Sequence, residues 1–163
     1  MKGFRQVLAG LLVGGFLLMP FSPAIAGDPV IKGGGNVGMG LVFGGPGAWG
    51  ASGKLWIDKD NALQPGLQLG NGATLLQLDY LFHSYDMVHP KTGLMPLYIG
   101  AGGELTLQSI LVVGARGVAG ISYLFDREDV PVDIFVQVVP ILWFYGAGPQ
   151  LNLYGEIGAH YYF

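Results

Sequence analysis

The sequence predicts an all-β fold, an antiparallel, eight-stranded, up-and-down transmembrane β-barrel that follows a cleaved signal peptide. Three observations lead to this prediction. Charged residues make up only 12 % of the chain, against roughly 25 % in an ordinary soluble domain. After the N-terminal stretch, no apolar run reaches the roughly 18 residues that a membrane helix needs. The C-terminal stretch also has the alternation of a long strand.

That C-terminal stretch spans residues 150–163. One set of alternate positions is apolar or small, and the intervening positions are mostly polar. A repeat of two residues indicates a β-strand. A strand of about ten residues with one apolar side and terminal aromatics fits a tilted crossing of a bilayer. The apolar set is Leu151, Leu153, Gly155, Ile157, Ala159, Tyr161 and Phe163.

Residues 1–26 are expected to be a secretory signal peptide. Lys2 and Arg5 precede an apolar core over residues 7–21, and Ala24 and Ala26 form the small-x-small cleavage pattern. An uncleaved anchor is the alternative. The remaining residues 27–163 would form one barrel domain with six basic and 11 acidic residues, which argues against a nucleic-acid partner. The chain has no cysteine, which excludes a lipoprotein anchor, disulfides and thiolate metal sites.

The first half of the barrel domain contains four alternating segments. Turn residues at 44–51 and 58–61 and the Asn71-Gly72 pair separate these segments, and the last of these is a strong hairpin signal. Pro65 weakens the third strand because proline cannot donate to the ladder. The predicted strands are 36–43, 52–57, 62–69 and 73–85.

The second half contains four more segments, joined by connections at 86–95, 109–111, 126–131 and 143–149. The connection at 109–111 lacks obvious turn residues, so its centre is hard to place. The other three contain glycine, proline or charged clusters. The predicted strands are 96–107, 112–125, 132–142 and 150–163.

The less apolar face of these strands is rich in glycine, and the chain has 29 glycines in all. A soluble barrel such as a lipocalin-like carrier would turn its apolar face inward and its polar face to water. A narrow eight-stranded lumen, by contrast, requires small residues beside large ones. We therefore predict that the glycine face lines the lumen and that the apolar face meets lipid.

The strand-borne charges share the predicted inner face, where each needs a partner. A turn centred on Ile110 would set Glu104 opposite Arg116, and a turn between Gly146 and Ala147 would set Gln137 opposite Glu156. The side chains would then satisfy one another and plug the lumen; a gated ion path or a catalytic acid is the alternative. The predicted network comprises Asp79, Glu104, Arg116, Gln137 and Glu156, with Lys54 and Asp133 as further inner charges.

The chain resembles the small outer-membrane barrels of the OmpA transmembrane-domain and OmpX type, and especially an uncharacterised short-loop group. The similar stretches are GLVFGGPGAWGASGKLWI, LDYLFH, MPLYIGAGG, GISYLF and the terminal GAHYYF. The resemblance implies a Gram-negative outer-membrane location. It also implies a C-terminal signal for the outer-membrane assembly machinery, carried by Ile157, Ala159, Tyr161 and Phe163.

Catalytic motifs are weak. The histidines are His83, His89 and His160, and none forms the His-x-Ser pattern of barrel lipid A deacylases or a metal-binding spacing. No cofactor is expected. We predict a structural or surface-interaction barrel. Its expected partners are outer-membrane lipid and a surface partner that the sequence does not identify. A porin-like narrow pore for ions or small solutes and a lipid A-modifying enzyme are the alternatives.

Overall fold

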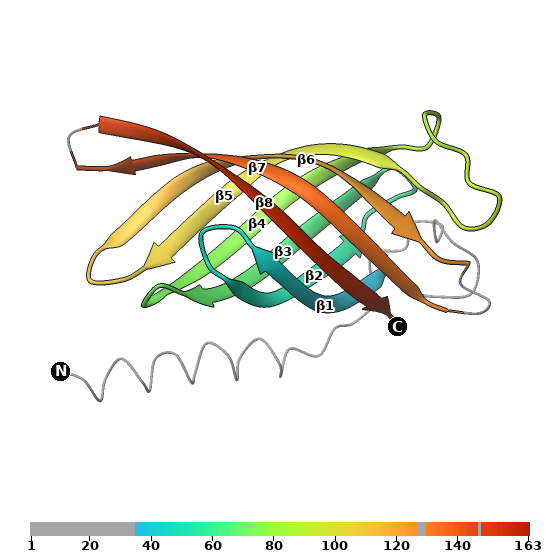
Figure 1. The fold of residues 1–163 in the computed structure, drawn as a ribbon, viewed down its shortest axis with the longest axis horizontal. Helices are drawn as coiled ribbons and strands as arrows, with labels where there is room; N and C mark the ends of the chain where they lie inside the picture. Colours follow the sequence, from blue (N-terminus) through green and yellow to red (C-terminus); the bar gives the residue numbers. More distant parts are fainter. Residues whose placement is uncertain (1–34, 127–129, 147) are drawn as a thin grey trace.

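The computed structural model describes residues 35–126, 130–146 and 148–163 and shows an all-β, antiparallel barrel (Figure 1). The strand order is β1 to β8 in sequence, and β1 pairs with β8 to close the ring. The signal-peptide prediction, including Ala24 and Ala26, lies outside the described residues. The strands are β1 Val37–Gly44, β2 Trp49–Trp56, β3 Asn61–Gly70, β4 Ala73–Ser84, β5 Leu97–Leu107, β6 Leu111–Leu124, β7 Val132–Tyr145 and β8 Gly148–Tyr162.

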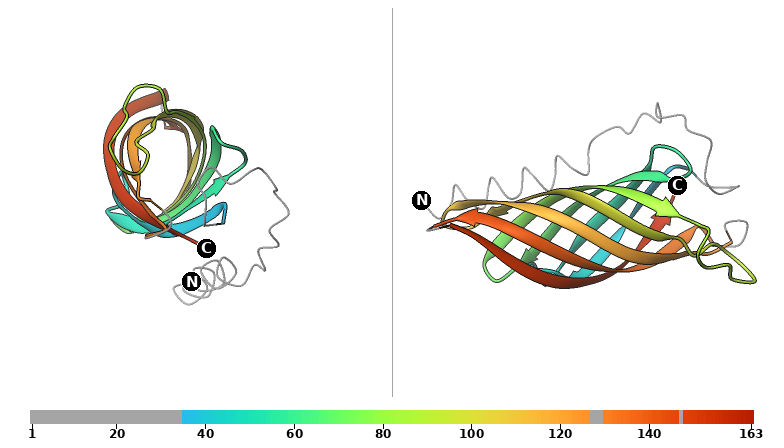
Figure 2. Two further views of the ribbon diagram at one scale, coloured as in Figure 1. Left: turned by 90° about the vertical axis from the view of Figure 1, so that its right-hand side faces the viewer. Right: turned by 90° about the horizontal axis from the view of Figure 1, so that it is seen from above.

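The eight-stranded up-and-down topology predicted from alternation is therefore confirmed. Seen end-on, the tilted strands enclose one lumen (Figure 2). Among the described residues, no helix is long and apolar enough to cross a membrane. The connections β2–β3, β4–β5 and β6–β7 lie at the same end as the C-terminus, and the other four hairpins lie at the opposite end (Figure 1).

Several strand boundaries differ from the prediction. β2 begins at Trp49 instead of Ser52. β7 continues to Tyr145 and β8 begins at Gly148, so most of the aromatic and glycine loop predicted at 143–149 belongs to strands. The chain reverses at Gly146, which has a φ of 62° that glycine adopts without a Cβ penalty. Aromatic residues next to glycines suggested a loop, yet the aromatic side chains pack as strand residues.

Two prolines interrupt the ladder locally, and both lie on the outward face. β2 and β3 pair on either side of Pro65, but the register skips the pairs opposite Pro65 and Gln64. β6 and β7 skip in the same way around Pro140. A proline has no N–H to offer the neighbouring strand, which explains both gaps. The third strand nevertheless forms, because Pro65 keeps its pairing with Leu78 in β4.

The β2–β3 turn is held by one carboxylate. Asp58 accepts hydrogen bonds from the backbone N–H groups of Asp60 and Asn61 and from the Asn61 side chain, at 2.8–2.9 Å. The Asn61 side chain and then the Asp60 backbone hold the pKa of Asp58 below its ordinary value. The polar turn predicted at 58–61 thus has a specific side-chain anchor.

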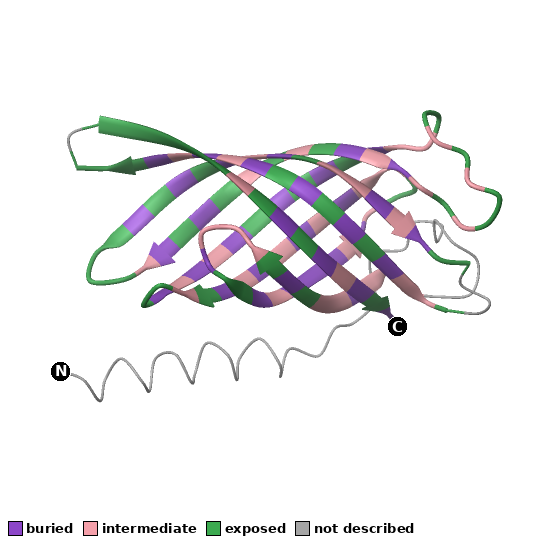
Figure 3. Cartoon of the chain, viewed as in Figure 1, coloured by how far each residue is buried: buried purple, intermediate pink, exposed green. Residues whose placement is uncertain are grey.

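Burial alternates from residue to residue along most of the barrel wall, whereas residues 148–153 at the start of β8 are all exposed (Figure 3). All six strand-borne charges are buried inside: Lys54, Asp79, Glu104, Arg116, Asp133 and Glu156. Within the described strands, no Asp, Glu, Lys or Arg lies on the outward face. The outward face instead exposes large apolar side chains, among them Leu41, Phe43, Trp49, Leu78, Phe82, Ile99, Val113, Val136, Val138, Leu153 and Ile157. The predicted inner placement of the glycine face is confirmed.

Candidate functional site in the barrel lumen

Arg116 on β6 is the centre of a buried ion cluster. Its Nε lies 3.1 Å from Asp79 Oδ1 on β4, and its Nη2 lies 3.4 Å from Glu156 Oε2 on β8. Its Nη1 donates to Glu104 Oε2 on β5. All four side chains are closed to solvent. One guanidinium fork therefore serves three carboxylates, which is a geometry that a lysine ammonium does not provide.

The position of Gly102 explains how Arg116 reaches Asp79. Gly102 on β5 pairs with Asp79 on one side and with Arg116 on the other. A Cβ at Gly102 would overlap Asp79 Oδ1 and the Leu78 carbonyl oxygen. The absence of a side chain on β5 lets the side chains of β4 and β6 meet across it. Asp79, for which the sequence predicted membership of the network but no specific partner, therefore contacts Arg116 directly.

The register predicted for the β5–β6 hairpin is wrong. Glu104 pairs with Gly114, and Arg116 pairs with Gly102, so the hairpin is centred on Ser109 and not on Ile110. The Glu104–Arg116 contact still forms, because diagonal neighbours on one face remain within reach of long side chains. The turn lacks Asn-Gly or a comparable signal, and local sequence therefore did not fix its centre.

Amide side chains extend the cluster toward β3 and β7. Gln137 lies opposite Glu156, as predicted from a turn between Gly146 and Ala147, and its Nε2 donates to Glu156 Oε2 at 2.6 Å. Gln68 donates to the other Glu156 oxygen at 3.0 Å. Tyr98 donates its hydroxyl to Gln137 Oε1 at 2.9 Å, reaching across Gly120. The structure thus brings all five predicted network residues into one connected set.

A second buried cluster surrounds Asp133 on β7, closer to the barrel end that carries the C-terminus. Asp133 Oδ2 accepts from the Tyr162 hydroxyl at 2.6 Å and lies 3.6 Å from Lys54 Nζ. Its Oδ1 lies 2.9 Å from His160 Nδ1. The Lys54 ammonium also sits 4.7 Å from the centre of the Trp56 ring, within cation–π range.

This second cluster contains a Ser–His–Asp chain that the sequence reading missed. Ser52 Oγ lies 2.9 Å from His160 Nε2, and His160 Nδ1 lies 2.9 Å from Asp133. Ser52 and His160 meet over Gly40, which pairs with both of them. The His-x-Ser pattern cannot reveal this contact, because Ser52 lies on β2, His160 lies on β8, and β1 lies between these two strands. The sequence feature that could have indicated the contact is Gly40, which lies between Ser52 on one neighbouring strand and His160 on the other.

The geometry of this chain is that of an acyl-transfer triad, but its surroundings are not. A nucleophilic serine needs space beside Oγ for the substrate carbonyl and for oxyanion donors. Ser52 is only 3 % exposed, and the Phe135 ring stacks on His160 with centroids 4.9 Å apart. Asp133 is moreover shared with Lys54 and Tyr162. These contacts satisfy the buried polar atoms of Ser52, His160 and Asp133.

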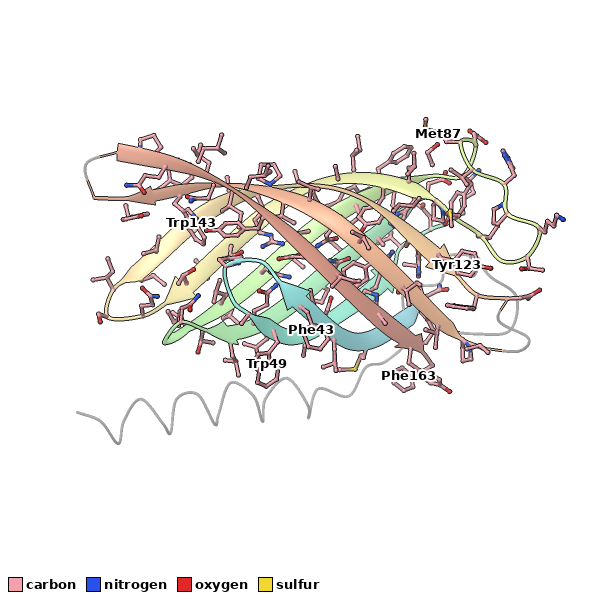
Figure 4. All side chains as sticks on the ribbon, in the orientation of Figure 1. Phe43, Trp49, Met87, Tyr123, Trp143 and Phe163 are labelled. Atoms are coloured by element: carbon pink, nitrogen blue, oxygen red, sulfur yellow. The ribbon has the colours of Figure 1, made fainter. Side chains whose placement is uncertain are left out.

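Apolar side chains pack above and below the polar clusters. Trp56, Ala62, Leu124 and Tyr162 form one buried group, and Val112, Val139, Ile141 and Trp143 form another. Phe43 and Trp49 project from the outer wall, whereas Trp143 is buried (Figure 4). Cavities of about 400 and 340 Å³ open at the two mouths. In the part of the chain that the structure describes, no group of three or more His, Asp or Glu residues could hold a metal ion.

The residues of the predicted assembly signal lie along the outward face of β8 and just beyond it. Ile157, Tyr161 and Phe163 expose more than half of their surface, and Ala159 lies between them. Phe163 also donates its backbone N–H to Val37 across the β1–β8 closure. Comparison with protein-family models, with curated proteins and with solved structures found no significant match to this chain.

Proposed function

We propose that this chain is a structural or surface-interaction barrel of the outer membrane, resembling the OmpA and OmpX type, and that it does not catalyse a reaction. The observation that carries the proposal is the outward face of the described strands. It has no charged side chain and exposes large aliphatic and aromatic residues. Water would leave this face poorly solvated and prone to association, whereas hydrocarbon suits it.

The proposed path to the membrane follows from both ends of the chain. Residues 1–26 act as the export signal, and Ile157, Ala159, Tyr161 and Phe163 are recognised by the assembly machinery. The C-terminus, the start of β1 and the connections β2–β3, β4–β5 and β6–β7 then face the periplasm. The four remaining hairpins face the cell exterior, where a surface partner would bind them. Outer-membrane lipid surrounds the barrel wall.

A narrow ion pore is the second candidate, because several buried polar atoms of the lumen have no hydrogen-bond partner among the described residues, including Gln68 Oε1 and Gln77 Nε2. Glu104 Oε1 is buried and has no hydrogen-bond partner. A buried unsatisfied oxygen calls for an explanation, and a cation or water passing through would supply a partner. The filled lumen argues against this path, because Arg116 occupies its centre. Stepwise conductance in planar bilayers would favour the pore.

A lipid A-modifying enzyme is disfavoured for a similar reason. The Ser52–His160–Asp133 chain faces the lumen and is closed to solvent, whereas the lipid substrate would contact the outer wall. Incubation of the refolded barrel with labelled lipid A tests this directly. Release of an acyl chain that depends on Ser52 would overturn the assignment of a non-catalytic barrel.

The decisive experiment combines cell fractionation with a heat-modifiability gel, which reports location and barrel closure together. We expect the processed chain in the outer-membrane fraction, with a band that shifts on heating. In vesicles of brominated lipid, Trp49 should be quenched, because it is 53 % exposed on the outer wall while Trp56 and Trp143 are buried. A Trp49→Phe variant is the control. Recovery as a soluble periplasmic protein with unquenched tryptophan would reject the proposal.

A further inference from the structure

The mouth of the barrel opposite the C-terminal end contains a cavity of about 340 Å³. All four hairpins at this end contribute side chains to its wall. The β7–β8 hairpin extends furthest, because β1 pairs with β8 only from Glu156 onward (Figure 1). Small-molecule sites occupy about 300–1,000 Å³, and this cavity lies at the lower end of that range. Its size therefore suits a small ligand or the end of a longer one.

The wall of this cavity offers hydrogen bonds but no charge. Among the described residues that line it, none is Asp, Glu, Lys, Arg or His. Amide and aromatic side chains supply much of the wall instead. They include Gln108, Gln150, Asn152, Trp143, Tyr145 and Tyr154.

The inward face of β7 and β8 changes its chemistry along the barrel. Deep in the lumen this face carries the carboxylates of Asp133 and Glu156. Towards the mouth it carries aromatic and amide residues, and Trp143 pairs with Gln150 across the hairpin. Water at the mouth would solvate charged side chains readily, so solvation does not account for this change. An uncharged, hydrogen-bonding face suits a neutral polar ligand.

One buried polar atom at the cavity lacks a partner. Thr106 lines the cavity and is 8 % exposed, and its Oγ1 makes no hydrogen bond to any described residue. A buried hydroxyl of this kind calls for an explanation, because nearly all such groups are paired. A hydroxyl both donates and accepts, so a ligand hydroxyl would satisfy it.

Two hydrogen bonds hold the rim of the cavity in place. Asn71 Nδ2 donates to the Pro46 carbonyl at 3.3 Å and joins the β3–β4 turn to the β1–β2 connection. The Tyr145 hydroxyl donates to Gln150 Oε1 at 2.8 Å. These two bonds use neither the Asn71 amide oxygen nor the Gln150 amide N–H groups. A rim that is ordered before binding lowers the entropic cost of taking up a ligand.

We propose that this cavity binds a neutral carbohydrate, as an uncharged sugar unit of a surface glycan. Sugar hydroxyls donate and accept hydrogen bonds, as do the amide side chains and Thr106. The C–H faces of a sugar ring pack on aromatic rings such as Tyr145 and Tyr154. The choice of a surface glycan rests on the proposed function, because that function places this mouth at the cell exterior.

The same wall disfavours other classes of ligand. A phosphate or carboxylate would find no cationic side chain among the described lining residues, and a cationic ligand would find no carboxylate. Peptide recognition commonly uses a free strand edge or a captured chain terminus, whereas side chains line this cavity. A neutral sugar therefore matches the wall best.

Saturation-transfer NMR on the full processed barrel tests the site, in dodecylphosphocholine because this detergent contains no sugar. The probes are maltotriose, cellotriose and chitotriose, with citrate as an anionic comparison and triglycine as a peptide comparison. We expect transfer to at least one of the three sugars and to neither comparison. The sugar Kd should change by less than about twofold between about 0.05 and 0.5 M NaCl, because salt does not screen a neutral ligand. Transfer to none of the sugars, or to citrate or triglycine in their place, would overturn the proposal.

Two neighbouring aromatic residues on β7 provide a matched pair of variants. Tyr145 lines the cavity and is 41 % exposed, whereas Phe144 lies on the outward face and is 53 % exposed. Tyr145→Leu removes a stacking face and the bond that orients Gln150, and it should raise the sugar Kd about tenfold. Phe144→Leu should change the Kd by less than about twofold. Equal effects of the two variants would show that the sugar does not bind in the cavity.

Thr106→Val separates binding from stability. The Thr106 hydroxyl has no described partner to lose, so the urea midpoint of the barrel should stay the same or rise. The sugar Kd should rise about two- to twelvefold, which corresponds to the loss of one hydrogen bond. Unchanged sugar affinity in this variant would overturn the proposal, whatever its urea midpoint.

The outcomes for the site and for the location are distinguishable. A barrel that is recovered in the outer-membrane fraction but binds no sugar would reject the site and leave the proposed location intact. A barrel that is recovered from the periplasm but binds sugar with the expected variant effects would support the site and reject the location.

Discussion

Arg116 shows how one residue balances a buried lumen. Its guanidinium contacts three carboxylates from three other strands. Removing it would leave Asp79, Glu104 and Glu156 facing one another with no cation among them. The loss of one partner from a buried ion pair costs about 3–5 kcal/mol, because the remaining charge stays desolvated.

We therefore expect Arg116→Met to lower the free energy of unfolding by about 3–5 kcal/mol. The measurement is the urea midpoint of the barrel in detergent, together with the temperature of the heat-modifiability shift. Lys59→Met is the control, since Lys59 is 79 % exposed and its pairing with Asp60 is solvent-screened. Equal midpoints for Arg116→Met and the parent chain would contradict the paired cluster.

Ser52 gives a second test at the same scale. If the Ser52–His160–Asp133 chain only satisfies buried groups, Ser52→Ala should cost about 0.5–1.5 kcal/mol of stability, the usual loss for one hydrogen bond. A fluorophosphonate probe should not label the parent barrel, because a serine 3 % exposed offers no room for attack. Labelling that disappears in Ser52→Ala would show that the triad is reactive.

At the scale of the strands, glycine determines which side chains meet. Three inner glycines each have a larger polar residue opposite them on both neighbouring strands, and the two side chains make contact across the glycine. Gly102 joins Asp79 to Arg116, Gly40 joins Ser52 to His160, and Gly120 joins Tyr98 to Gln137. The conformational cost of glycine in a strand is thus offset by polar contacts that would otherwise be blocked.

Two adjacent glycines, Gly102 and Gly103, allow the packing role of an inner glycine to be distinguished from the general effect of glycine on strand stability. Gly102→Ala should destabilise the barrel by about 1–3 kcal/mol, the usual cost of overpacking, because its Cβ would overlap Asp79. Gly103 is the next residue of β5 but faces outward, and its Cβ would meet only the Gly114 carbonyl at 3.8 Å. Gly103→Ala should be neutral or stabilising in the same urea titration. Equal losses for both variants would contradict the packing role.

These contacts also show where sequence reasoning succeeds. Alternation predicts each strand and its inner face, because a half-buried strand repeats every two residues. The hairpin centred between Gly146 and Ala147 has a glycine turn, and its Gln137–Glu156 pairing was predicted correctly. The turn at Ser109 has no such signal, and its predicted centre is one residue off. The Ser52–His160 contact depends on the β1–β8 closure, which no local pattern encodes.

At the scale of the whole molecule, the inner surface of the barrel and its outer wall differ completely in charge. Its few strand charges are all inside and its outer wall has none. A soluble carrier with the same strands would carry charge on the outside. The charge distribution therefore predicts which medium surrounds the barrel wall.

That prediction concerns depth. Leu78 lies near the middle of β4 and is 53 % exposed, whereas Ile110 lies in the β5–β6 turn and is 62 % exposed. If the wall meets lipid, Leu78→Arg should cost about 2–4 kcal/mol in vesicles and Ile110→Arg about 0–1 kcal/mol, since an arginine is costliest at the bilayer midplane. If the wall meets water, both changes should stay within about 0.5 kcal/mol, as ordinary surface substitutions do. Urea unfolding of both variants in phosphatidylcholine vesicles distinguishes the two cases, because the two side chains are similarly exposed but lie at different distances from the barrel mouth.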